Sequence, residues 1–245
     1  MTVFKTLLYE KKDGVATITL NRPRAMNAFS VQMRDDLYHV LGALKDDPEV
    51  GVAIVMGAGE KAFCAGADLN EFLTAPSPVI ARHVRFARDV WGRFVSVPQP
   101  LIAVLHGYVL GSGIEIALCC DIRIASEDVR LGMPEVDLGI IPAAGGTQTL
   151  PRAVGPGNAF EMLLTNRWID AGEACRIGLI NRVVKKDELL PVAGRIAKKI
   201  ASYPSEAVRY AKTAVVRGAD HSLAEGLELE RRLASRLASH AGRGI

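Results

Sequence analysis

The middle of the 245-residue chain reads Leu101-Ile-Ala-Val-Leu-His-Gly-Tyr-Val-Leu-Gly-Ser-Gly-Ile-Glu-Ile-Ala-Leu-Cys-Cys120. The apolar run 101–105 predicts a buried β-strand, because uninterrupted apolar residues are typical of strands covered on both faces. Residues 113–120 predict a short apolar helix, entered through closely spaced glycines that let a ligand approach the backbone. A buried strand that leads into a helix favours an α/β protein.

The same alternation of strands and helices continues on both sides of this stretch. Strands are predicted at 15–20, 52–56, 122–125 and 129–131. Ser30 is the expected N-cap of a helix whose apolar residues recur along one face, and 84–95 predicts another helix. Most of the first 157 residues therefore fit one α/β core.

The last third of the chain has a different pattern. Helices are predicted over 158–165, 170–177, 187–201, 205–217 and 221–239, and only 182–184 resembles a strand. We therefore predict an α/β core over 1–157 and a helical C-terminal region over 158–245. A helical region of this length also suggests contacts between subunits.

Composition excludes several classes of protein. Apolar residues make up 49% and charged residues 23%, and the net charge is +3, which is too small and dispersed to indicate nucleic-acid binding. The four cysteines lack CxxC spacing and the five histidines lack metal-ligand spacing, so no metal site is predicted. The sequence shows no signal peptide or membrane span, and we expect a cytoplasmic protein.

A first candidate site is Phe63-Cys-Ala-Gly-Ala-Asp-Leu69. Asp68 followed by Glu71 resembles a capping box at the start of a helix. The small residues before it leave the backbone N–H of Ala67 uncovered, where an anion or a polarised carbonyl oxygen can bind. Tight packing of a turn is an alternative explanation for the same small residues.

A second candidate site combines two carboxylates. Glu115 lies inside the apolar helix after Gly111 and Ser112, and burial there would suit acid–base catalysis. Alternatively, Glu115 is a first-turn carboxylate that the helix dipole favours. Glu135 follows a proline just beyond a strand; such residues are usually solvated, so its interest is as a partner for Glu115.

Five motifs in order carry a resemblance to a known family. The segments are Gly14-Val-Ala-Thr-Ile-Thr-Leu-Asn-Arg-Pro-Arg-Ala-Met-Asn-Ala28, Phe63-Cys-Ala-Gly-Ala-Asp-Leu69, Gly107-Tyr-Val-Leu-Gly-Ser-Gly-Ile-Glu-Ile-Ala117, Cys120-Asp-Ile-Arg-Ile-Ala125 and Pro134-Glu-Val-Asp-Leu-Gly-Ile-Ile-Pro-Ala-Ala-Gly-Gly-Thr-Gln148. The chain resembles the crotonase, or enoyl-CoA hydratase/isomerase, superfamily over nearly its whole length. The resemblance implies a spiral of ββα repeats with a helical C-terminal trimerisation region, assembled as a homotrimer or a dimer of trimers.

The resemblance also implies an acyl-CoA substrate and roles for individual residues. The N–H groups of Ala67 and Ser112 would form an oxyanion hole for the thioester oxygen. Glu115 would take a proton from water while Glu135 supplies one to the α-carbon. The residues implied in binding CoA are Arg24, Ala25, Ala65, Asp68, Leu69 and Gly111. No metal is implied, and no cofactor beyond the CoA of the substrate.

The sequence departs from the family pattern in two places. Ser112 stands where glycine is usual, which keeps the N–H but adds a hydroxymethyl group, and we expect altered substrate choice. Relatives usually continue past the equivalent of Ile245 through a helical segment that helps to cover CoA, so we expect weaker CoA binding.

Hydration of a 2-enoyl-CoA is the leading interpretation, because both carboxylates of the hydratase motif are present. Isomerisation, thioester hydrolysis and decarboxylation on the same fold are alternatives, since fold does not fix the reaction. Isomerases of the family commonly keep only the second carboxylate. A non-catalytic RNA-binding protein of this fold is a further alternative, although the charges form no run or stripe.

Overall fold

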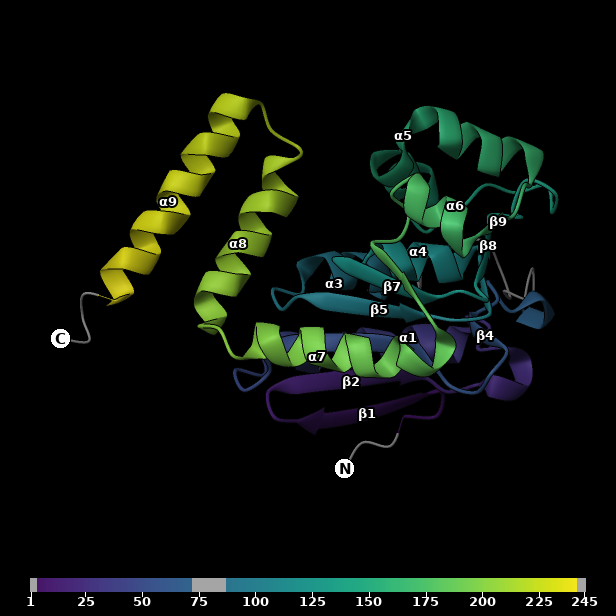
Figure 1. The fold of residues 1–245 in the computed structure, drawn as a ribbon, viewed down its shortest axis with the longest axis horizontal. Coiled ribbons are helices and arrows are strands. Elements are labelled where there is room, and N and C mark those ends of the chain that lie inside the picture. The colour runs from purple at the N-terminus through teal and green to yellow at the C-terminus, as the bar shows by residue number, and fades with distance from the viewer. Residues whose placement is uncertain (1–3, 72–86, 242–245) are drawn as a thin grey trace.

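The computed structural model describes residues 4–71 and 87–241. Two sheets organise the first three quarters of the chain (Figure 1). The large sheet has the order β1-β2-β3-β5-β7-β10 and the small sheet has the order β4-β6-β8-β9. The strands of the large sheet are β1 (Leu7–Lys12), β2 (Val15–Leu20), β3 (Val52–Gly57), β5 (Leu101–Leu105), β7 (Ile122–Ser126) and β10 (Arg182–Val184). Those of the small sheet are β4 (Ala62–Cys64), β6 (Tyr108–Leu110), β8 (Arg130–Gly132) and β9 (Ile169–Asp170).

The chain forms successive pairs of strands, and each pair contributes one strand to the large sheet and the next to the small sheet. The pairs β3–β4, β5–β6 and β7–β8 follow one another along the chain, and the strands within β3-β5-β7 and within β4-β6-β8 pair in parallel. Helix α4 (Ser112–Leu118) follows the second pair and α5 (Gly146–Thr165) follows the third. The predicted α/β architecture of ββα repeats is therefore confirmed.

The first hairpin closes through the turn expected from Asp13-Gly14. Asp13 has φ 52° and Gly14 has φ 75°, the left-handed conformations that a two-residue hairpin turn requires. The register places Lys12 opposite Val15, so β1 and β2 pair antiparallel along their full length.

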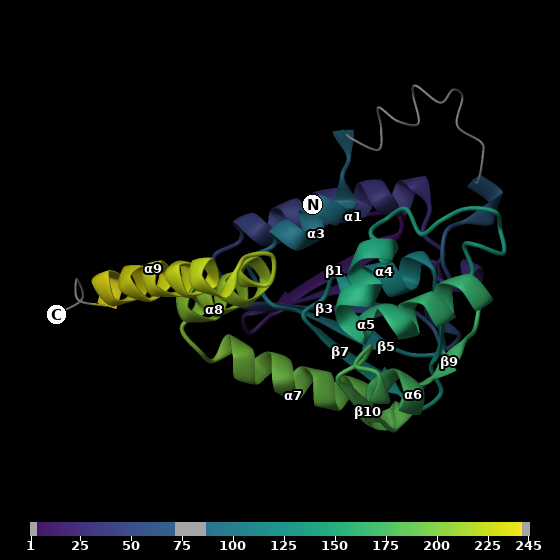
Figure 2. The same cartoon turned by 90° about the horizontal axis from the view of Figure 1, so that it is seen from above.

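The two faces of the large sheet belong to two separate cores. Ala53 and Val55 of β3 pack in the larger core, whereas Val52 and Ile54 pack in the other. Figure 2 shows α1 (Val31–Asp46) and α3 (Val90–Ser96) on one face of this sheet and α7 (Leu189–Ala201) on the opposite face. Burial on both faces explains the continuous apolar strands in the sequence.

Helix α1 begins as predicted, because the Ser30 hydroxyl accepts the Met33 N–H at 3.1 Å. The helix predicted over 84–95 has a different start in the structure. Within the described residues, α3 begins only at Val90, where the Asp89 carboxylate accepts the Gly92 N–H at 2.9 Å. Val84 lies outside the described residues.

Helix α5 begins twelve residues earlier than the sequence predicts. It contains Pro151 and Pro156 and is kinked at Gly155, where φ is 76° and ψ is 156°. Prolines and glycines weaken the helical pattern, so only the part after residue 158 was recognisable. The predicted division at 157/158 falls close to this kink, inside α5, and as a domain boundary it stays a prediction.

The C-terminal region is helical as predicted. After α6 (Ala171–Arg176) and α7 come α8 (Ser205–Gly218) and α9 (Leu223–Ala241), which pair with each other and project from the sheet (Figure 1). Short 3₁₀ turns occur at Pro23–Ala25, Leu69–Glu71 and Lys186–Glu188. Among the helices of the described residues, none is both long and apolar enough to cross a membrane.

Candidate active site

A cavity of about 590 Å³ collects four of the predicted site residues. They are Ala67, Ser112, Glu115 and Glu135. Ala67 follows β4 of one repeat, Ser112 and Glu115 lie on α4 of the next, and Glu135 follows β8 of the third. The spiral therefore brings together residues that are up to 68 positions apart (135 − 67).

Helix α4 presents the Ser112 N–H at its first turn. Ser112 is the first helical residue, so its N–H has no acceptor within the helix. The preceding Gly111 has φ 48° and ψ −116°, and a Cβ atom there would lie 2.6 Å from Glu135 Oε1. The left-handed backbone conformation therefore favours glycine at this position, and a larger residue would also displace the Glu135 carboxylate.

The Ala67 N–H is made available by the way its neighbours pair. Phe29 N–H donates to Gly66 O at 2.8 Å, and Asp68 N–H donates to Phe29 O at 3.0 Å. In this parallel bridge the groups of Ala67 itself point away from Phe29. Ala67 is exposed and lines the cavity, so its N–H can serve as a second donor there.

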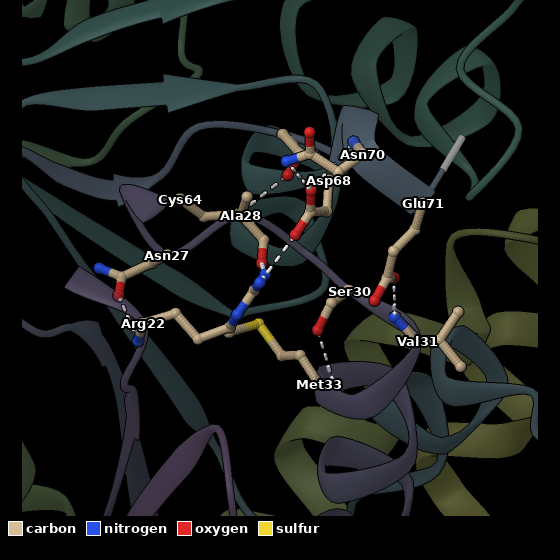
Figure 3. Close-up of polar contacts among 11 residues, drawn as sticks. Arg22, Asn27, Ala28, Ser30, Val31, Met33, Cys64, Asp68, Asn70 and Glu71 are labelled. Atoms are coloured by element: carbon tan, nitrogen blue, oxygen red, sulfur yellow. Dashed lines mark hydrogen bonds and ion pairs between the residues drawn. The ribbon is translucent and has the colours of Figure 1, made fainter. Parts of the chain in front are cut away.

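The predicted capping box at Asp68 and Glu71 is wrong. Glu71 Oε2 accepts the N–H of Val31, at the start of α1, at 2.6 Å (Figure 3). The Asp68 N–H donates to Phe29 O instead. Asp68 Oδ1 accepts the Asn70 N–H at 3.1 Å within the short turn 69–71. Asp68 thus keeps a local N–H donor, whereas Glu71 caps a helix that is distant in the sequence.

Arg22 holds the segment that contains Ala67 in place through hydrogen bonds, a role that the sequence did not indicate. Its Nη2 donates to Asp68 Oδ2 at 2.7 Å and its Nη1 donates to Ala28 O at 2.6 Å (Figure 3). The guanidinium holds the pKa of the Asp68 carboxyl below its usual value. The only signal in the sequence was the position of Arg22 inside the first quoted motif.

Asn27 links the Arg22 stretch to the chain around Ala58 and Ala62 by hydrogen bonds. Its Nδ2 donates to Ala58 O at 2.9 Å and to Ala62 O at 2.8 Å, and its Oδ1 accepts the Arg22 N–H at 2.9 Å. Asn27 is fully buried with φ 56°, a left-handed conformation that asparagine tolerates better than most residues.

The Glu115 carboxylate is held by the start of α5. Its Oε1 accepts the N–H groups of Ala144 at 3.0 Å and Gly146 at 2.9 Å, and only 2% of the residue is exposed. A Cβ atom at Gly146 would lie 2.9 Å from the same oxygen. Hydrogen bonds from backbone N–H groups favour the ionised form of a carboxylate, which suits a proton acceptor.

The Glu135 carboxylate has a contrasting environment. It is 8% exposed, and its Oε2 has no hydrogen-bond partner among the described residues. Burial raises the pKa of Glu135 to about 7, and the nearby charge of Glu115 adds to the rise. Near neutral pH, Glu135 can therefore carry a proton, which suits a proton donor.

Apolar side chains and two arginines form the remaining walls of the cavity. The rings of Phe29 and Trp91 lie 5.5 Å apart, and Ile140 and Ile141 also line the cavity. Arg34 and Arg88 were not predicted as site residues. They reach the cavity from α1 and from just before α3, and nothing in their local sequence marked them.

None of the residues predicted to bind CoA lines the cavity. Arg24 and Ala25 are exposed on the turn 23–25, and Leu69 is exposed on the turn 69–71. Ala65 N–H donates to Met26 O at 3.1 Å, which ties these two stretches together. Their contacts with CoA stay a prediction. In the described part of the chain, no group of His, Cys, Asp and Glu could hold a metal ion.

Comparison with known proteins identifies the same family that the sequence motifs resemble. A family model described as "Enoyl-CoA hydratase/isomerase" matches residues 10–244. The chain is 43% identical over 232 residues to a probable enoyl-CoA hydratase of Mycobacterium bovis, covering 94% of this chain and 88% of the relative. It is 40% identical over 228 residues to the crotonyl-CoA hydratase of Syntrophomonas wolfei, covering 93% and 87%.

Solved structures with a closely similar fold include enoyl-CoA hydratases. The crystal structure of enoyl-CoA hydratase from Bacillus anthracis is 40% identical with a TM-score of 0.89, covering 94% of this chain and 90% of that one. DspI of Pseudomonas aeruginosa is 34% identical with a TM-score of 0.90, covering 97% and 90%.

Proposed function

The chain belongs to the enoyl-CoA hydratase/isomerase family, and on that basis we propose that it is an enoyl-CoA hydratase. It adds water across the double bond of a 2-enoyl-CoA thioester. The observation that carries the proposal is the pair of buried carboxylates on one cavity, one bound by N–H groups and the other favoured in its protonated form.

The thioester oxygen binds between the N–H groups of Ala67 and Ser112. These donors stabilise the negative charge that develops on the oxygen as the thioester becomes an enolate. Donors fixed by a strand bridge and a helix start need little reorganisation during the reaction, which is the condition for effective electrostatic stabilisation.

The two carboxylates divide the proton transfers. Glu115 accepts a proton from a water molecule as the water oxygen bonds to the β-carbon. Glu135 donates its proton to the α-carbon as the enolate collapses. The substrate has then gained one water, and the proton passes back from Glu115 to Glu135 before the next turnover.

Binding of the CoA portion involves the exposed segments near Ala67. Arg24 contacts the nucleotide phosphates, and the stretches with Ala25, Ala65 and Leu69 contact adenine and pantetheine. The Asp68 carboxylate is engaged by Arg22, so its contribution to CoA binding comes from its backbone and its place in the loop.

The test is incubation with crotonyl-CoA, followed by the loss of absorbance of the conjugated thioester and identification of the 3-hydroxyacyl product. Hydration is the expected result. An isomerase would instead interconvert 2-enoyl and 3-enoyl thioesters, and a hydrolase would release free CoA. Either of these outcomes, or no turnover, would contradict the proposal.

We also propose that the chain assembles as a homotrimer or a dimer of trimers. Support comes from α8 and α9, which project from the sheets and expose apolar side chains such as Val215 and Leu223. A cytoplasmic location is part of the same proposal, supported by the four free thiols, which suit a reducing compartment.

A further inference from the structure

Two arginines line the cavity that holds the catalytic carboxylates, and hydration of a simple fatty enoyl-CoA gives neither of them a role. Arg34 comes from α1 and Arg88 from just before α3. Phe29, Trp91 and the isoleucines suit a hydrocarbon chain. A guanidinium group whose free N–H donors face a hydrocarbon loses hydration there, which is unfavourable unless another polar group replaces the water.

The two arginines share one carboxylate. Arg34 donates from Nε and Nη2 to Asp35 Oδ1 at 2.9 and 2.8 Å, and Arg88 Nη1 lies 3.4 Å from Asp35 Oδ2. Asp35 itself does not line the cavity. Each guanidinium has five N–H donors, so this sharing holds both groups in place and leaves donors for a further anion.

Two titratable neighbours of the arginines, Asp89 and His39, have contacts of their own. Asp89 lines the cavity, but its carboxylate accepts the Gly92 N–H at 2.9 Å and caps α3. His39 Nε2 lies 3.4 Å from Arg88 Nη1, on the same α1 helix as Asp35. Within the described residues, Asp35 is the only carboxylate that forms an ion pair with either arginine.

We propose that Arg34 and Arg88 form a subsite for a carboxylate at the far end of the acyl chain. The preferred substrates are then 2-enoyl-CoA thioesters of dicarboxylic acids, and the inference rests on the proposed hydratase function. The thioester end lies between Ala67 and Ser112, the methylene groups contact the apolar walls, and the terminal carboxylate binds the guanidinium donors. Arginine suits this role because its planar donors match a carboxylate.

A phosphate of CoA is the other anion that this substrate brings. The two sources differ in which substrates they affect. A phosphate contact serves every CoA thioester equally, whereas a contact with the acyl carboxylate serves only the acidic ones. The comparison of a neutral and an acidic substrate of equal length therefore separates them.

The experiment uses hex-2-enoyl-CoA and hex-2-enedioyl-CoA, which differ only in a terminal methyl or carboxylate. The native enzyme is expected to have the higher kcat/KM for the acidic substrate. Arg34→Gln and Arg88→Gln should each lower the ratio of acidic to neutral kcat/KM about tenfold, as expected for loss of a hydrogen bond to a charged group. Arg34→Lys keeps the charge and should retain part of the preference.

Arg152→Gln is the matched control, because Arg152 is exposed on α5 and donates to Gln148 O of its own helix. It should leave the ratio as in the native enzyme. Circular dichroism of each variant checks folding. If the Arg34 and Arg88 variants lower kcat/KM for both substrates equally, the arginines bind CoA or act structurally, and the inference is wrong.

A binding measurement keeps this inference separate from the proposed function. Calorimetry with the saturated analogues adipoyl-CoA and hexanoyl-CoA needs no turnover. Tighter binding of adipoyl-CoA, reduced in Arg34→Gln, supports the subsite even if hydration fails. Equal binding of the two analogues overturns the subsite, even if crotonyl-CoA is hydrated.

Discussion

Glu115 and Glu135 are the same residue type in the same cavity, yet the backbone around them differs. Glu115 receives two N–H donors from the start of α5, whereas one oxygen of Glu135 has no partner among the described residues. The sequence predicted both carboxylates and their pairing. It did not predict the donors, because Ala144 and Gly146 lie some thirty positions beyond Glu115.

Replacing either carboxylate by the isosteric amide should stop most of the reaction. Glu115→Gln removes the proton acceptor and Glu135→Gln removes the donor, and each loss should lower kcat by about 10²–10⁴. The measurement is crotonyl-CoA hydration, with circular dichroism as the folding control. A folded variant with near-native kcat would show that its residue takes no part in proton transfer.

The raised pKa of Glu135 gives the reaction a pH dependence. As the proposed donor, Glu135 must be protonated, so activity should be present below its pKa of about 7 and decline as the pH rises through that value. The profile of kcat/KM with pH reports this group in the free enzyme. A flat profile from pH 6 to 9 would show that Glu135 does not supply the proton.

Two substitutions at Ser112 distinguish a role of its backbone N–H from a role of its side chain. Ser112→Gly keeps the N–H and should retain activity, whereas Ser112→Pro removes one oxyanion donor and should lower kcat by about 10²–10³. The first position of a helix tolerates proline, so the fold should survive this change. A folded but inactive Ser112→Gly enzyme would instead indicate that the hydroxyl group acts as a nucleophile.

At the scale of elements, the stretch 22–31 and the loop 65–71 act as one unit. Arg22 bonds to Asp68 and Ala28, and Glu71 caps the N-terminus of α1, so the position of Ala67 depends on this network. The sequence predicted the strand, the helix and the exposed N–H. It assigned Asp68 and Glu71 to each other because their spacing is local. Instead, Asp68 Oδ2 accepts from Arg22, 46 positions away, and Glu71 accepts from Val31, 40 positions away, while Asp68 Oδ1 accepts from nearby Asn70.

Arg22→Met should loosen the Ala67 segment and lower kcat by up to about 10²-fold, the cost of a small misplacement of a catalytic group. Arg24→Met is the matched control, since it changes a neighbouring exposed arginine. It should raise KM for CoA thioesters more than it lowers kcat, because a phosphate contact is distant from the reacting carbons. The same kinetic change in both variants would contradict the positioning role of Arg22.

At the scale of the whole molecule, the spiral was predicted through the family motifs and through the buried strands. The start of α5 was missed, because its first turns carry prolines and glycines that make up no helical pattern. The N–H groups at the start of α5 hold Glu115. The helix start that the sequence did not predict therefore positions a carboxylate that the sequence did predict.

The projecting helices should mediate assembly. Light scattering is expected to give a mass of three or six chains for the native protein. Val215→Glu combined with Leu223→Glu places charges on the exposed apolar side chains of α8 and α9 and should reduce that mass, whereas Lys199→Gln on α7 should not. A native protein with the mass of one chain would exclude the proposed assembly.

The hydrogen bonds from Ala144 and Gly146 to Glu115 also concern the synthesis of the protein on the ribosome. Ala67 emerges first, then Ser112 and Glu115, then Glu135, and the donors that hold Glu115 emerge last. A nascent chain that ends between Glu135 and Ala144 contains every proposed catalytic side chain but lacks the groups that hold Glu115. Enzymatic competence therefore requires that translation has passed Gly146, the start of α5.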